Sequence, residues 1–353
     1  MPRALPGRLS DRTQSLDILL LERIVPEALA WLEERHAVQN RFDIAADTSA
    51  IRKALYKSAA VLVPRKVAVT REMLDFAPLL KVVARMQAGA DNTDLEACRE
   101  RKIRVVQATT ANVRSNAEYL LASLLLLYRR GIGATLAGDR HSEIRMGREV
   151  HGSVVGIFGL APTAHTLALS LHALGAKLIG YDPAVHSTAP IWARLGIQPV
   201  SQQEMLSQSD AISLQVMFAS RYQGFINDKM LASCKRGQVW VGISRSHLFD
   251  PPALARALTD GRIEAAMLDG GQSNFAAKGS PLYEIPNLFL TPKLGSFTVE
   301  TRARASWYVA HRVHEALTTP HSGPESVPIG QMHLDAQVSA LGPISGPASL
   351  DDR

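Results

Sequence analysis

The fold is decided by the stretch VVGIFGLAPTA, residues 154–164, in which an apolar run of strand type ends at a glycine. A helical pattern follows, with apolar residues three and four positions apart as far as Leu174, and Gly175 ends it. The next apolar run, Lys177 to Tyr181, predicts a second strand, and Asp182 comes directly after it. Short buried strands joined by helices are typical of a parallel sheet covered on both faces. The stretch therefore predicts a strand–turn–helix–strand unit of α/β type.

The turn of this unit carries the pattern Gly159-x-Ala161-x-x-Ala164. In a dinucleotide-binding turn, the first glycine allows the bend, the second lets the backbone approach a pyrophosphate, and the third lets helix and strand pack closely. Ala161 adds a methyl group at the second position, and Pro162 suits a first helical turn. Asp182 stands 23 positions after Gly159, near the ~20 expected of an acid that binds ribose hydroxyls, and it favours NAD over NADP. The alternative is a strand–helix–strand unit that binds nothing.

The same alternation of strands and helices extends on both sides of this unit. Strands are predicted at Asp17–Leu21, Ala60–Val63, Lys81–Ala84, Arg104–Val106, Ser153–Phe158, Lys177–Tyr181, Ala211–Val216, Val239–Ile243, Ala265–Leu268 and Leu288–Leu290. Helices are predicted at Pro26–Arg35, Thr48–Tyr56, Thr70–Phe76, Asp94–Lys102 and Asn116–Arg130. At roughly 150 residues per domain, the 353 residues suggest about two domains.

Composition excludes several classes of protein. The longest apolar run, Tyr119 to Tyr128, is far short of the ~20 residues that span a bilayer, so no membrane partner is expected. Two cysteines, Cys98 and Cys234, cannot build a disulfide framework or a multi-cysteine metal site, and they fit a reducing, cytoplasmic compartment. The formal charge is +6, from 39 Lys and Arg against 33 Asp and Glu, but the basic residues are scattered. Because they are scattered, we expect no nucleic-acid partner. No metal is expected either.

Six segments resemble the motifs of one family, in the same order and with the same spacing. They are RMQAGADNTDL (85–95), NAE (116–118), Gly156 to Asp182, VGISRSHLFD (241–250), GRIEAAMLD (261–269) and NLFLTPKLGS (287–296). Together they resemble the D-isomer-specific 2-hydroxyacid dehydrogenase family, the group that contains phosphoglycerate dehydrogenase, glyoxylate/hydroxypyruvate reductase and formate dehydrogenase. The resemblance covers residues 17–317 of the chain.

The resemblance implies two Rossmann-like or flavodoxin-like α/β domains with parallel sheets, the substrate domain being discontinuous. We expect residues 1–16 to be a flexible N-terminus and residues 17–112 with 297–318 to form the substrate domain. Residues 113–296 would form the NAD-binding domain, and residues 319–353 a flexible tail. Members of the family typically pair through the cofactor domain, so a homodimer is expected, with the apolar helix Asn116–Arg130 in the corresponding region.

The resemblance also implies an activity, the transfer of a hydride between NAD and C2 of a small 2-oxo or 2-hydroxy acid. The family uses an Arg, a His and a Glu, and these positions hold Arg245, Lys293 and Asn274 here. Arg245 is therefore expected to bind the substrate, and Lys293 is the candidate acid/base. Burial beside Arg245 would lower the pKa of the lysine. Because position 274 holds an uncharged asparagine and not a carboxylate, nothing at that position would oppose the shift.

The remaining site residues also follow from the resemblance. The expected cofactor-binding residues are Gly156, Gly159, Leu160, Ala161, Pro162, Thr163, Asp182, Val216, Ile243, Ser244 and Asp269. The expected substrate-binding residues are Ala88, Gly89 and Lys66.

A rival interpretation comes from another class of protein. The chain departs from the family at the His and Glu positions, and also at Gln87, Met217, Ala219 and Ser246. It could therefore be a catalytically silent, NAD-binding sensor or corepressor-like module that keeps the fold. Binding of NADH without reduction of any 2-oxo acid would favour this alternative.

Overall fold

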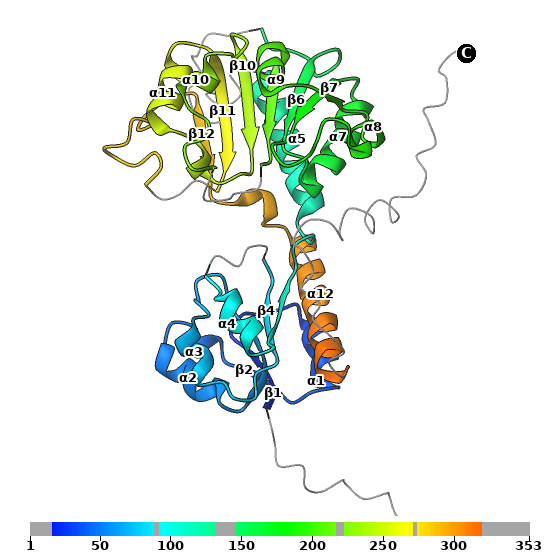
Figure 1. Cartoon of the computed structure of the whole chain (residues 1–353), viewed down its shortest axis with the longest axis vertical. Helices are drawn as coiled ribbons and strands as arrows, with labels where there is room; N and C mark the ends of the chain where they lie inside the picture. Colours follow the sequence, from blue (N-terminus) through cyan, green and yellow to red (C-terminus); the bar gives the residue numbers. More distant parts are fainter. Residues whose placement is uncertain (1–15, 88–91, 131–145, 217–221, 271–273, 320–353) are drawn as a thin grey trace, which may run out of the picture. The chain divides into compact units, whose positions relative to one another are not determined.

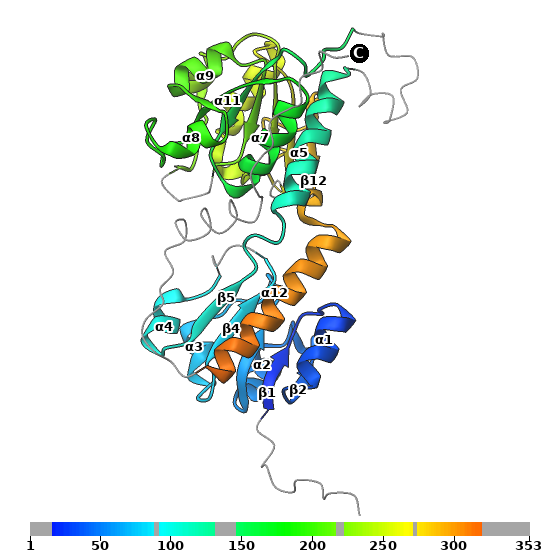
Figure 2. The ribbon, with the colours of Figure 1, turned by 90° about the vertical axis from the view of Figure 1, so that its right-hand side faces the viewer.

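The computed structural model describes residues 16–87, 92–130, 146–216, 222–270 and 274–319, nearly all of them within one compact unit, Met1–Thr318. Their strands form two parallel sheets, one of five strands and one of seven. Helices pack on both sheets (Figures 1 and 2). The predicted α/β class with parallel sheets is confirmed. Among the described residues, none of the helices has the length and apolar character needed to cross a bilayer.

The first sheet is built from the N-terminal part of the chain, with the strand order β2-β1-β3-β4-β5. Its strands are β1 (Leu16–Leu20), β2 (Val38–Asn40), β3 (Ser58–Leu62), β4 (Val82–Arg85) and β5 (Arg104–Gln107). Four of the five were predicted, with ends displaced by at most two residues. The sequence analysis missed β2, because three partly or fully exposed residues form no apolar run.

Five helices pack on this sheet: α1 (Pro26–Glu33), α2 (Thr48–Leu55), α3 (Arg71–Asp75), α4 (Leu95–Glu100) and the late α12 (Val299–Thr318). The side chains of Asp47, Thr70 and Asp94 each accept a hydrogen bond from a first-turn amide and so cap α2, α3 and α4. The buried face of α12, with Val309 and Val313, joins a core with β1, β3 and β4. A helix from the end of the described chain therefore completes the core of the first sheet, and the division into domains stays a prediction.

The second sheet has the strand order β12-β11-β10-β9-β6-β7-β8. Its strands are β6 (Val154–Phe158), β7 (Lys177–Tyr181), β8 (Gln198–Pro199), β9 (Ala211–Leu214), β10 (Gln238–Gly242), β11 (Ile263–Asp269) and β12 (Leu288–Thr291). The order reverses at β6, which pairs with β7 on one side and β9 on the other. In open α/β sheets, ligands bind outside the carboxyl ends of the strands at such a switch point. The turn after β6 therefore lies where the sequence analysis expects a ligand.

Six helices belong to this part: α5 (Val113–Tyr128), α7 (Pro162–Ala173), α8 (Pro190–Arg194), α9 (Gln202–Gln208), α10 (Asp228–Leu231) and α11 (Pro251–Thr259). α5 begins at Val113 and ends at Tyr128, two to three residues before the predicted bounds. The helices α8 to α11 were not predicted. α8 and α10 span five and four residues, which is too short to show a helical period. α9 carries a capping box of Ser201 and Glu204, a local signal that could have revealed it.

Candidate functional site

The turn after β6 brings backbone against backbone. Gly159 has φ +97°, and a Cβ placed on it would lie 2.6 Å from the amide nitrogen of Val216 and 2.8 Å from the carbonyl carbon of Gln215. Any other residue would be strained at this φ and would collide with the backbone that directly follows β9. The glycine therefore lets the turn lie directly on the neighbouring strand.

α7 starts from this turn without a side-chain cap. Ala161 is its N-cap and makes no capping hydrogen bond through its side chain, and Pro162 occupies the first turn. The first amides of a helix have no partner within the helix and carry a partial positive charge, so they suit an anion such as a phosphate. Gly156 has a different role, because a Cβ there would lie 2.5 Å from Ser209 Oγ and 2.6 Å from Ile212 Cδ1. It allows β6 to pack against its neighbours.

Asp182 faces the turn from the end of β7. Its Oδ2 accepts a hydrogen bond from the Leu160 amide at 2.7 Å, and its Oδ1 accepts one from the Ala184 amide at 2.7 Å. The carboxylate therefore stabilises the turn, and each oxygen keeps a lone pair for a ligand hydroxyl. These features fit NAD: a glycine where the turn meets the neighbouring backbone, a helix start without a side-chain cap, and an acid at the end of the adjacent strand. The residues that would hold it are those of the turn, Gly159 to Thr163, and Asp182.

The ends of β9 and β10 are joined beside this turn. The hydroxyl of Ser244 donates to the carbonyl oxygens of Val216, at 2.9 Å, and of Leu214, at 3.3 Å. Because this side chain already holds the two strand ends together, it fixes where the following residue, Arg245, leaves the sheet.

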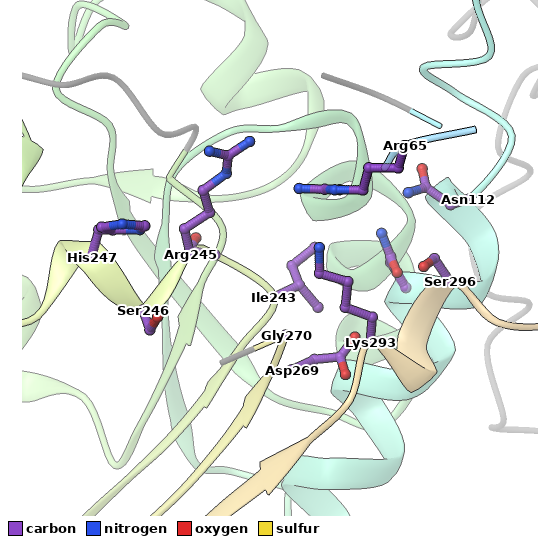
Figure 3. Close-up of a pocket in the computed structure, with 12 residues that line it drawn as sticks. Arg65, Asn112, Ile243, Arg245, Ser246, His247, Asp269, Gly270, Lys293 and Ser296 are labelled. Atoms are coloured by element: carbon purple, nitrogen blue, oxygen red, sulfur yellow. The ribbon is translucent and has the colours of Figure 1, made fainter. Parts of the chain in front are cut away.

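A polar cavity of about 270 Å³ opens at the carboxyl ends of β10, β11 and β12 (Figure 3). Its lining residues are Arg65, Asn112, Asn116, Ile243, Ser244, Arg245, Ser246, His247, Asp269, Gly270, Lys293 and Ser296. Arg245, Lys293, Asp269, Ile243 and Ser244 were expected here from the sequence. Figure 3 shows the side chains of Arg65, Arg245 and Lys293 pointing into the same opening.

Two expected residues lie elsewhere. Asn274 is exposed and does not line the cavity. Lys66 is exposed as well, and its neighbour Arg65 lines the cavity instead. The sequence analysis missed Arg65, although the residue follows the carboxyl end of β3, where the rule for ligand sites in α/β sheets applies. Ala88 and Gly89, with Met217 and Ala219, lie outside the described residues.

Asp269 organises the loop that carries Lys293. Its Oδ1 accepts hydrogen bonds from Thr291 Oγ1 at 2.6 Å and from the Leu294 amide at 2.8 Å. Its Oδ2 accepts one from the Gly295 amide at 3.0 Å. This carboxylate is only 7% exposed and is largely satisfied by the loop. Its donors are neutral, so the carboxylate keeps its charge and offsets part of the positive charge at the cavity, and its expected role in cofactor binding stays a prediction.

Lys293 sits in this clamped loop with a left-handed backbone, φ 61° and ψ 42°. Its amide donates to the Thr291 carbonyl at 3.0 Å. Burial lowers the pKa of the ammonium group, and the positive charges of Arg65 and Arg245 lower it further, while Asp269 opposes the shift. The pKa therefore moves in the direction that the sequence analysis expects, although the residue is exposed.

Arg245 stands between the end of β10 and a short 3₁₀ helix, Ser246–Leu248. Burial lowers the pKa of its guanidinium, as does repulsion from Arg65. Arg245 nevertheless stays charged, because the ordinary pKa of a guanidinium lies far above neutral pH. The cavity thus gathers two fixed cations and one lysine of lowered pKa, an arrangement suited to an anionic ligand whose oxygen exchanges a proton. Within the ranges that the structure describes, no group of His, Cys, Asp and Glu could hold a metal ion.

Comparison with known proteins gives a consistent picture. The protein-family model described as "D-isomer specific 2-hydroxyacid dehydrogenase, NAD binding domain" matches residues 122–295. This range includes the turn, Asp182, Arg245 and Lys293. The chain is 34% identical over 325 residues to the D-3-phosphoglycerate dehydrogenase of Mycobacterium tuberculosis, covering 91% of this chain and 60% of that relative. It is 31% identical over 308 residues to the (S)-sulfolactate dehydrogenase of Chromohalobacter salexigens, covering 85% of this chain and 98% of the relative.

Solved structures agree on the fold. The TT0316 protein from Thermus thermophilus has a TM-score of 0.73 at 27% identity, covering 85% of this chain and 96% of the other. A glyoxylate reductase from Paecilomyes thermophila has a TM-score of 0.73 at 24% identity, with 86% and 96% covered. The present chain spans about 60% of the length of the mycobacterial relatives.

Proposed function

Because this chain belongs to the D-isomer-specific 2-hydroxyacid dehydrogenase family, we propose that it is an NAD-dependent oxidoreductase that interconverts a 2-oxo acid and a 2-hydroxy acid. The observation that carries the proposal is the cavity in which Arg245 and a lysine of lowered pKa, Lys293, point into one opening. The silent sensor module is not favoured, because the relatives that match along most of this chain are named as dehydrogenases.

Each residue has a defined task in the reaction. When bound, NAD supplies or accepts the hydride at C2 of the substrate. Arg245 binds the carboxylate and orients the adjacent oxygen through its planar pair of N–H donors. During reduction, the ammonium group of Lys293 donates a proton to the oxygen on C2, and during oxidation the neutral amine takes it back. The lowered pKa of Lys293 makes both forms accessible closer to neutral pH.

The charge of the cavity points to a substrate with a second anionic group. Among the described residues that line the cavity, Arg65, Arg245 and Lys293 carry positive charge and Asp269 carries one negative charge. One substrate carboxylate would leave an excess of positive charge. The names of two relatives specify acids that carry such a group, 3-phosphoglycerate and sulfolactate. We assign the second anionic group to Arg65.

Two further properties belong to the proposal. NAD is preferred over NADP, because the carboxylate of Asp182 would repel a 2′-phosphate and no arginine follows it directly. The protein is a cytoplasmic homodimer in which α5 contributes to the interface. Leu125 on this helix is 38% exposed, and Leu121 and Leu126 are partly exposed. A single monomer mass in light scattering at micromolar concentration would contradict the dimer.

The experiment that tests the function is a fluorescence titration with NADH, followed by measurement of NADH oxidation with a panel of 2-oxo acids. The panel pairs acids of similar size with and without a second carboxylate, phosphate or sulfonate. We expect NADH to bind and the dianionic acids to have the higher kcat/KM. If NADH binds and none of the acids is reduced, the silent module replaces this proposal.

A further inference from the structure

The aliphatic part of Lys293 passes directly over a glycine. A Cβ placed on Gly270 would lie 3.0 Å from Lys293 Cγ, 3.2 Å from its Cε and 3.7 Å from its Cδ. These three atoms are the nearest neighbours of that position. Figure 3 shows Gly270 beside the lysine, just after Asp269 at the end of β11. The bare backbone of Gly270 thus forms the surface along which the lysine reaches the cavity.

Neither backbone can move away from this contact easily. The Gly270 amide donates to the Thr291 carbonyl at 2.8 Å, and the Lys293 amide donates to the same carbonyl at 3.0 Å. The two residues after Lys293 are held by Asp269 through their amides. Gly295 has no spare room either, because a Cβ there would lie 3.0 Å from Asn116 Oδ1. A group added at Gly270 would therefore have to displace the lysine side chain.

We propose that Gly270 is a positioning residue for Lys293, whose bare backbone keeps the amine between Arg245 and Arg65. This role matters for catalysis only if Lys293 is the proton donor, so the proposal rests on the proposed function. It explains how this chain accommodates a lysine at that position. With a methyl group at position 270, Cγ and Cε must give way by a few tenths of an ångström, and this shift is passed on to the amine at the end of the side chain.

The displacement has an electrostatic consequence. The charged or titratable groups that line the cavity around the amine are Arg65, Arg245, His247 and Asp269. Moving the amine away from the two arginines removes repulsion, and moving it toward water removes desolvation. Both changes raise the pKa of Lys293 toward its ordinary value.

Gly270 also has φ +81°, so replacement by alanine strains the backbone whatever the lysine does. Gly279 provides a matched control. It has φ +93°, it is exposed, and a Cβ placed on it would meet nothing within 4 Å. Gly279→Ala therefore introduces comparable strain without touching a side chain.

The test measures the reactivity of Lys293 toward acetic anhydride against pH, by mass spectrometry of the full chain without cofactor or substrate. Only the neutral amine reacts, so the midpoint of the curve reports the pKa. We expect Gly270→Ala to raise this midpoint by a few tenths of a pH unit, within the spread of about one unit that lysine pKa values show in folded proteins. Gly279→Ala should leave the midpoint unchanged. An unchanged midpoint in Gly270→Ala, with the fold retained, would overturn the proposal.

A second measurement covers the case in which Gly270→Ala is too unstable to label. Gly270→Ala is made in the wild type and in Lys293→Ala, which lacks the Cγ and Cε atoms, and thermal unfolding is recorded. We expect a smaller loss of Tm in the truncated background, because only the backbone strain remains. Equal losses in both backgrounds would overturn the proposal. Neither measurement needs turnover, so a failure of the proposed function would be seen separately, as NADH binding without reduction of any 2-oxo acid.

Discussion

Two regions at the edge of the larger sheet are built on different principles. The turn after β6 is made by the backbone: Gly159 lies against Val216, and Asp182 bonds to the Leu160 amide. The cavity at the ends of β10 to β12 is made by side-chain charge, brought together from three distant parts of the chain as Arg65, Arg245 and Lys293. The turn depends on local conformation and the cavity on electrostatics. Changes in the two regions should therefore separate cofactor binding from turnover.

The largest effect is expected in the cavity, from Lys293→Ala. Loss of the proton donor should lower turnover by about 10²–10⁴-fold, the usual size of a general acid/base contribution. The Kd for NADH, measured by fluorescence, should hardly change, because the turn is untouched. Unchanged turnover would make the lysine a bystander, and a large loss of NADH binding would break the separation of the two regions.

Arg65→Ala should act on binding of the second anionic group. A hydrogen bond to a charged group contributes about 1.5–3 kcal/mol, so KM for a dianionic 2-oxo acid should rise by about 10- to 100-fold. A monoanionic acid of the same size should be affected far less. Lys66→Ala is the matched control, since this neighbouring lysine lies outside the cavity. Equal effects on both acids would contradict the role assigned to Arg65.

In the turn, Asp182→Asn should weaken the discrimination between cofactors. The asparagine keeps an oxygen for the Leu160 amide, but it loses the acceptor for the Ala184 amide and the charge that repels a 2′-phosphate. We expect the ratio of NADPH to NADH dissociation constants to fall by about tenfold, which corresponds to ~1.4 kcal/mol. Turnover with saturating NADH should stay close to that of the wild type. Tighter binding of NADPH than NADH by the wild type would refute the preference itself.

The smallest effect is expected from Ala161→Gly. Ala161 has φ −59° and ψ 157°, which any residue adopts, so glycine brings no conformational gain. It removes only a methyl group from the expected path of the pyrophosphate. The Kd for NADH should fall by a few-fold, and a small loss of stability from the more flexible unfolded chain should accompany it. A weaker affinity for NADH would show that the methyl group does not crowd the cofactor.

The contrast between the two regions also explains what could be read from the sequence. The strand that ends at Gly159, the helix that follows and the acid at Asp182 form one continuous pattern, and the parallel sheets follow from repeated apolar runs. Short elements such as β2 and β8 carry too few apolar residues to show a period. Their positions depend on pairing with neighbouring strands, which a local pattern does not contain.

The cavity was predicted less completely, for a physical reason. Arg245 and Lys293 were found through motif positions, but Arg65 was assigned one residue late, as Lys66. Asn274 was placed in the site by the resemblance to the family, and the structure leaves it exposed and away from the cavity lining. The role of Gly270 is a contact with a residue on another strand's loop. Such contacts arise only when the chain is folded.

The central claim, that Lys293 exchanges the proton on the substrate oxygen, is tested most directly by the pH dependence of turnover in both directions. The pKa of Lys293 is lowered by burial and by the two arginines, so the protonated form is lost as pH rises through a value below that of a free lysine. Reduction should therefore slow above this pKa, while oxidation of the 2-hydroxy acid should speed up through the same pKa. Lys293→Ala should lose both transitions. Profiles that keep these transitions in the variant would contradict the account.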